Sequence, residues 1–223
     1  MGKIFVATLG FDEKFIIGGL VRHNISRGDR VYLLTVEPVE EKTRVAFNRV
    51  EEFIKNYVKG VKIELVAFKL TNFVDLTIDI MDFLNSIAKC DKKVYVNLSG
   101  GMRALILSLY NALFFLSRKF TTNHIRVQVD VELENRSGVF NLKPGLLNLI
   151  AFYSSITAND LKFLNAIGEE SSLKELVNKM GLQPSTVSKK INKLEKLGLV
   201  EVINKKPLKV RVAECAKFLK FIV

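Results

Sequence analysis

Short apolar segments alternate with segments of helical spacing along residues 1–143. Five runs rich in β-branched residues predict strands, at 3–9, 30–36, 61–68, 93–98 and 125–133. Between them, apolar positions recur at intervals of three and four residues, which predicts helices over 12–25, 40–57, 74–88 and 102–118. Strands that alternate with helices indicate βαβ units on a mainly parallel, Rossmann-like sheet.

The fifth predicted strand departs from the pattern of the others. Apolar and polar residues alternate strictly from Ile125 to Leu133. Such alternation indicates that one face of the strand is solvated, unlike a central parallel strand. A turn-rich segment, 135–138, and a short apolar run, 139–142, come next. We therefore predict an antiparallel hairpin at one edge of an α/β sheet.

The helix predicted at 102–118 is apolar on nearly every side. A helix that is hydrophobic all round is buried all round. A sheet covers only one side of it, so we expect the other side to meet a second subunit. The pattern thus predicts a homodimer.

Two loops at the predicted carboxyl ends of strands carry candidate ligand-binding residues. They are Thr8-Leu9-Gly10-Phe11-Asp12 and Asn97-Leu98-Ser99-Gly100-Gly101-Met102-Arg103. Ligands of doubly wound sheets bind at this edge. Two adjacent glycines allow close approach of a ligand, the following helix N-terminus favours an anion, and Arg103 adds a permanent cation. Alternatively, the glycines only form a tight turn that Ser99 caps. Neither a Walker A motif nor a full G-x-G-x-x-G is present, which disfavours ordinary ATP or dinucleotide binding.

Residues 157–223 predict a small winged helix-turn-helix domain, joined to the first domain by an apolar linker at 144–156. Capping boxes at 157–160 and 172–175 each open a helix, and Gly181 supplies a turn before a third helix. A strand at 199–203, a basic turn at 204–207 and a second strand at 208–212 then form the wing.

The third helix of this domain has the composition of a DNA-recognition helix. Val187, Ile191 and Leu194 form one buried stripe. The other faces are small, polar or basic, with no carboxylate before Glu195: Ser185, Thr186, Ser188, Lys189, Lys190, Asn192 and Lys193. A recognition helix should not repel phosphate. The alternative is a small helical domain that mediates protein contacts.

The charge distribution favours the same interpretation. The chain has a formal net charge of +11, of which 13 Lys or Arg and 7 Asp or Glu in 157–223 contribute +6. The remaining 21 Lys or Arg and 16 Asp or Glu give residues 1–156 a charge of +5, so the C-terminal third is nearly three times as basic per residue. A basic module suits the DNA backbone, although lysine-rich surfaces also serve solubility alone.

The remaining polar residues predict no further chemistry. Cys90 and Cys215 form no metal-ligand pattern and fit a reducing interior. With no secretory signal and no apolar stretch of membrane-spanning length, we expect a soluble, cytoplasmic protein. His23 and His124 have no visible partners, and each is interpreted as a surface or hydrogen-bonded histidine. Asp75, Asp79 and Asp82 are interpreted as a solvated stripe on one helix. We expect no metal, no cofactor and no membrane contact, and we expect the protein not to be an enzyme.

The segment SSLKELVNKMGLQPSTVSKKINKLEKLGLVE, within 157–213, resembles the winged helix-turn-helix of MarR- and ArsR-type transcription regulators. The resemblance implies that double-stranded DNA is a partner. It places one set of residues in the major groove and two lysines at the wing tip: Ser185, Thr186, Ser188, Lys189, Asn192 and Lys193, with Lys205 and Lys206.

The motifs ATLGFD, after the first strand, and NLSGGMR, after the fourth, are similar to those of the CRISPR-associated Rossmann-fold (CARF) domain. With the winged helix, the chain resembles the archaeal type I-A CRISPR-associated transcription regulators. This implies a homodimer that shares one site for a cyclic oligoadenylate, with cyclic tetra-adenylate as the expected size, and that controls transcription of a CRISPR array or of cas genes. The implied ligand-binding residues are Thr8, Gly10, Phe11, Asp12, Asn97, Ser99, Gly100, Gly101, Met102 and Arg103.

Two alternatives to this function stay open at the level of sequence. One is a ring nuclease that cleaves the cyclic oligoadenylate, with Ser99 positioning the reacting group and Arg103 stabilising the developing charge. The other is a regulator that senses a different anionic metabolite.

Overall fold

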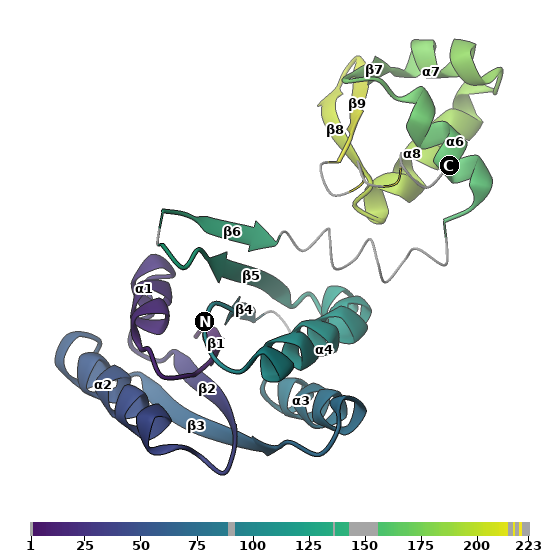
Figure 1. Ribbon diagram of the computed structural model, residues 1–223. Coiled ribbons are helices and arrows are strands. Elements are labelled where there is room, and N and C mark those ends of the chain that lie inside the picture. Colours follow the sequence, from purple (N-terminus) through teal and green to yellow (C-terminus); the bar gives the residue numbers. More distant parts are fainter. Residues whose placement is uncertain are drawn as a thin grey trace. The chain divides into compact units, whose positions relative to one another are not determined.

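In the computed structural model, six strands form one sheet in the order β3-β2-β1-β4-β5-β6 (Figure 1). All neighbours pair in parallel except β6, which is antiparallel to β5. The mainly parallel sheet with an antiparallel edge hairpin is therefore confirmed. The strands are β1 (Ile4–Thr8), β2 (Arg30–Glu37), β3 (Lys62–Lys69), β4 (Lys93–Asn97), β5 (Arg126–Glu132) and β6 (Val139–Leu142).

The structure describes residues 2–88, 92–135, 137–142, 156–213, 216 and 219, and only the backbone of Arg118. The chain divides into two compact units, Met1–Pro144 and Gly145–Val223. Cys90, Cys215 and the predicted linker, apart from Ile156, lie outside the described residues. The bounds of the linker stay a prediction.

Helices cover both faces of the sheet. The core on one face joins Phe5 and Leu33 of the sheet to Ile16 of α1 (Lys14–Arg22) and Val50 of α2 (Glu41–Tyr57). On the other face, α3 (Phe73–Ile87) and α4 (Arg103–Thr122) lie side by side (Figure 1). Helix α1 is shorter than the predicted 12–25 because Asn24, with a φ of 48°, adopts a left-handed conformation that ends it.

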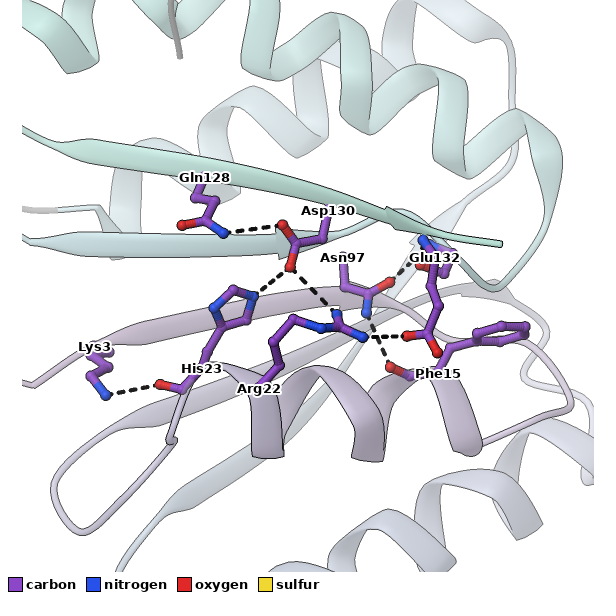
Figure 2. A network of polar contacts seen from close by, with 9 residues as sticks. Lys3, Phe15, Arg22, His23, Asn97, Gln128, Asp130 and Glu132 are labelled. Carbon is purple, nitrogen blue, oxygen red and sulfur yellow. Dashed lines mark hydrogen bonds and ion pairs between the residues drawn. The ribbon is translucent and has the colours of Figure 1, made fainter. Parts of the chain in front are cut away.

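The alternating pattern predicted that the polar face of β5 is solvated, but towards the carboxyl end of the strand this face is covered. Asp130 is only 1% exposed. Side chains from the C-terminal end of α1 cover this face and pair with its carboxylates (Figure 2). The prediction was wrong because charges that are paired with one another can be buried together.

Helix α4 is buried on only part of its surface. Leu105, Leu109 and Leu113 are fully buried, whereas Leu107 is 56% and Phe115 is 60% exposed. The sheet therefore does not cover the whole of this helix, as expected, and two of its large apolar side chains stay exposed among the described residues.

The C-terminal unit has the order predicted for a winged helix. Its elements are α6 (Ala158–Ala166), β7 (Ser171–Ser172), α7 (Leu173–Met180), α8 (Pro184–Lys196), β8 (Val200–Lys205) and β9 (Leu208–Val212), with the strands in the order β7-β9-β8. Both predicted capping boxes form, at Thr157 with Asp160 and at Ser172 with Glu175. Gly181, with a φ of 62°, ends α7 in the left-handed conformation that favours glycine. The first wing strand runs two residues further than predicted, to Lys205, so Lys206 and Pro207 alone form the turn.

Candidate functional site

The order of the strands brings the two predicted ligand loops together. Strands β1 and β4 are neighbours, and the chain continues from β1 towards one side of the sheet and from β4 towards the other. A crevice forms at the carboxyl ends of strands where the order reverses in this way. The Thr8 hydroxyl donates a hydrogen bond to the Gly100 carbonyl, which joins the loops directly.

Two glycines allow the backbones of these loops to touch. A Cβ atom on Gly10 would lie 3.0 Å from both the Cα and the nitrogen of Gly101. Gly101 itself has a φ of 97°, a conformation that side chains rarely adopt. The glycines therefore serve the contact between the loops as well as any approach of a ligand.

Three of the predicted ligand-binding side chains hold the loops in place. Thr8 and Asn97 are 1% and 2% exposed. The Asn97 amide donates to the Phe15 carbonyl over 3.1 Å, and its oxygen accepts from the Ser99 N–H over 2.9 Å (Figure 2). The Ser99 hydroxyl oxygen accepts from the Glu132 N–H over 2.8 Å. These side chains tie the loop after β4 to α1 and to β5.

The other predicted side chains lie at the surface of the loop pair. Phe11 is 58% and Met102 is 42% exposed, and Asp12 and Arg103 are exposed as well. The Lys42 ammonium lies 5.6 Å from the centre of the Phe11 ring. An aromatic ring, a cation and the N-terminus of α4 thus lie around the crevice.

The crevice holds an open pocket of about 290 Å³. From the two loops it is lined by Leu9, Gly10, Phe11, Gly101 and Met102, and from the end of β2 and the start of α2 by Thr35, Val36, Pro38, Glu40 and Thr43. The second group was missed by the sequence reasoning, which considered only glycine-containing loops. The position of Pro38 directly after a predicted strand was the signal that would have indicated it.

A largely buried polar network connects β5 to the C-terminal end of α1 (Figure 2). Arg22 donates to the Glu132 carboxylate over 2.7 Å, and His23 lies 2.6 Å from the Asp130 carboxylate. Burial raises the pKa of Asp130, but hydrogen bonds from His23 and Gln128 and the charges of His23 and Arg22 lower it below its ordinary value overall.

This network gives His23 the partners that the sequence did not reveal. Its ring also stacks on Tyr95 with a centroid distance of 4.0 Å. His23 is thus the hydrogen-bonded histidine of the two predicted possibilities, and His124 is exposed. Asp75, Asp79 and Asp82 are exposed on α3, which confirms the solvated stripe.

The predicted recognition helix, α8, has the expected two faces. Val187, Ile191 and Leu194 are buried. Ser185, Thr186, Lys189, Asn192 and Lys193 are exposed, Ser188 is half-buried, and Lys205 and Lys206 are exposed on the wing. Lys193 differs from the other lysines because its ammonium lies 2.5 Å from the carboxylate of Asp160. Which of these residues contact DNA stays a prediction.

Within the described part of the chain, no group of His, Cys, Asp and Glu side chains gathers closely enough to hold a metal ion. No described helix is long and apolar enough to cross a membrane.

Comparison with protein families identifies both units. Residues 3–143 match the model of the Csa3 CRISPR-associated Rossmann-like domain. The chain belongs to this family. Residues 161–202 match the ArsR family of bacterial regulatory proteins. The chain thus joins a Csa3 CRISPR-associated Rossmann-like domain to an ArsR-type helix-turn-helix.

Two solved structures are similar to the chain at low sequence identity. Protein VC1899 from Vibrio cholerae is 13% identical with a TM-score of 0.47, over 98% of this chain and 64% of that one. Can2 from Sulfobacillus thermosulfidooxidans, in complex with cyclic tetra-adenylate, is 14% identical with a TM-score of 0.40, over 98% of this chain and 63% of that one. The Csa3-family chain thus spans less than two thirds of the length of either protein. No curated protein matches it.

Proposed function

We propose that this protein senses a cyclic oligoadenylate, cyclic tetra-adenylate, and that the ligand changes its binding to the DNA of a CRISPR array or of cas genes. The observation that carries the proposal is the pocket between the loops after β1, β2 and β4, beside the N-terminus of α4. Helix N-termini and arginine both favour phosphate, and Arg103 is the first residue of α4. Phe11 and Met102 offer exposed apolar surface on which an adenine base can pack.

The proposal includes a homodimer. Five apolar side chains are exposed on the adjacent helices α3 and α4: Phe73, Val74, Ile78, Leu107 and Phe115. Exposed apolar side chains that gather on neighbouring helices mark a candidate interaction surface. We infer that a second copy covers it, and that two copies bind one ligand.

The dimer is tested by charging this surface. Light scattering after gel filtration should give the mass of two chains for the wild type and of one chain for Leu107→Glu. Val45→Glu is the control, because Val45 is 41% exposed on α2, on the other face of the sheet. A wild type with the mass of a single chain would remove the dimer from the proposal.

The ligand is tested by calorimetric titration of cyclic tetra-adenylate into the full-length protein. We expect tight binding of one ligand per two chains, and weaker binding to Arg103→Ala. Arg126→Ala is a matched control, since Arg126 is an exposed arginine at the amino end of β5, the opposite end of the strand from the pocket. No binding by the wild type would refute the ligand and leave the DNA-binding regulator in place.

We expect the protein to bind the cyclic oligonucleotide without cleaving it. The Ser99 oxygen, which a ring nuclease would use to position the reacting group, accepts the N–H of Glu132. Linear product after incubation with stoichiometric protein would favour the ring nuclease instead, and recovery of a different nucleotide with the purified protein would favour another anionic ligand.

A further inference from the structure

Asp160 is a buried carboxylate that faces the recognition helix from α6. Its side chain is 3% exposed. The N–H and the hydroxyl of Thr157 donate to its Oδ2 over 3.1 and 2.8 Å. Two lysines of α8 complete its surroundings, with the Lys193 ammonium 2.5 Å from Oδ2 and the Lys190 ammonium 3.4 Å from Oδ1.

The carboxylate is firmly ionised in this position. Burial would raise the pKa of Asp160, but the hydrogen bonds from Lys193 and from Thr157, with the Lys193 charge, lower it to about 2. The negative charge is therefore present at neutral pH and is matched by lysines from α8. Lys190 also lies 5.7 Å from the centre of the Phe163 ring, which holds it over the core.

Lys189 differs from these two lysines, although it lies on the same helix one turn before Lys193. Its side chain is exposed, and it forms no ion pair with any described residue. The sequence does not distinguish these two exposed lysines of α8, but in the structure Lys193 is paired with Asp160 and Lys189 is not paired with any described carboxylate.

We propose that Asp160 is a positioning residue of the DNA interface, which holds Lys193 and Lys190 against α6 so that α8 approaches the phosphate backbone with Lys189. This rests on the proposed DNA-binding role of α8. The Asp160 carboxylate cancels one of the two positive charges of Lys190 and Lys193, so together they add a net charge of one to the surface. Moving Lys193 to a phosphate would leave a buried carboxylate with fewer partners, which is unfavourable. Pairing with Asp160 therefore reduces the sequence-independent part of the DNA affinity. Base contacts by residues such as Ser185 and Thr186 then contribute a larger share of the total affinity.

The test is the salt dependence of binding to a double-stranded DNA of mixed sequence, measured with the full-length protein. Each phosphate contact contributes about 0.9 to the slope of log affinity against log salt concentration. We expect Lys189→Ala to lower the slope by about 0.9 and Lys193→Ala to leave it unchanged. Asp160→Asn should raise the slope by about 0.9 for each lysine it releases, and Lys193→Ala added to Asp160→Asn should lower it again by about 0.9.

A loss of slope in Lys193→Ala as large as that in Lys189→Ala would overturn the role of Asp160 and leave the docking of α8 intact. No change in either variant would instead overturn the docking, and the role of Asp160 with it. Because Asp160 also caps α6, Asp160→Asn can weaken folding. The comparison of the two lysine variants keeps Asp160 in place, so its result does not depend on how well Asp160→Asn folds.

Discussion

The contact between the loops after β1 and β4 predicts that a single added methyl group at Gly101 lowers the free energy of unfolding more than it does at Gly28, whose φ is also positive. A Cβ atom there would lie 3.1 Å from the Thr8 Cβ and 3.4 Å from the Leu9 carbonyl group. Gly28 provides a matched control in the same unit. Its φ of 89° is close to the 97° of Gly101, but a Cβ atom there would meet nothing within 4 Å.

The expected loss of stability is the sum of three contributions, two of which the sites share. An alanine at a positive φ costs about 1–2 kcal/mol of the free energy of unfolding, partly offset by about 0.4–1 kcal/mol because the unfolded chain is less flexible. Both terms apply to Gly28→Ala and to Gly101→Ala. Overpacking at the loop contact adds about 1–3 kcal/mol at Gly101 alone. We expect Gly28→Ala to cost about 1 kcal/mol and Gly101→Ala about 2–4 kcal/mol.

The assay is urea unfolding followed by far-ultraviolet circular dichroism, which suits a chain without tryptophan. The midpoint of unfolding and its slope are compared between the two variants and the wild type. Equal destabilisation by both substitutions would refute the reasoning, because it would mean that the loops separate to admit the methyl group at no cost. We also expect Gly101→Ala, and not Gly28→Ala, to weaken the binding of cyclic tetra-adenylate.

Three further predictions concern other parts of the chain. The pKa of Asp160 is lowered from 3.8 to about 2, and this difference contributes about 2 kcal/mol to the free energy of unfolding above pH 4. The contribution is lost as the pH falls through 2, so urea unfolding from pH 5 to pH 2 should show the loss in the wild type and not in Asp160→Asn. Asp130→Asn should lower the free energy of unfolding by about 2 kcal/mol in the same assay at neutral pH, because it weakens hydrogen bonds with charged groups inside the polar network. A loss no greater than that of Asp79→Asn, on the surface of α3, would contradict this. Phe11→Ala should leave stability within about 0.5 kcal/mol but weaken ligand binding about tenfold, and unchanged affinity in calorimetry would remove Phe11 from the site.

Much of the fold could be predicted because its determinants lie close together in sequence. The period of the apolar residues distinguishes strand from helix within a few residues. The two capping boxes each join residues three apart, Thr157 with Asp160 and Ser172 with Glu175. The edge hairpin was likewise predicted from one strand and the turn that follows it.

The sequence predicted where the candidate site lies, but not what each of its residues contacts. Glycine-rich loops after two strands were correctly expected to meet, because parallel strands end at one edge. Three of the predicted ligand contacts also hold these loops together, which the sequence did not reveal because hydrogen-bonding capacity alone does not tell whether a group faces the protein or a ligand. Whether they contact a ligand stays a prediction. Thr8, Asn97 and Ser99 are engaged by backbone groups of Gly100, Phe15 and Glu132.

The sequence by itself determined the two-unit organisation, the order of strands and helices, and the polar and apolar faces of α8, because each depends on a local period or cap. Only the tertiary structure decided which polar groups are paired. His23 lies 107 residues from Asp130, and Lys193 lies 33 residues from Asp160, yet each pair is within hydrogen-bond distance. Such pairing depends on how helices pack against strands and against one another. For that reason, a carboxylate that looks solvated in the sequence can be buried, and two similar lysines on one helix can differ in their freedom to bind DNA.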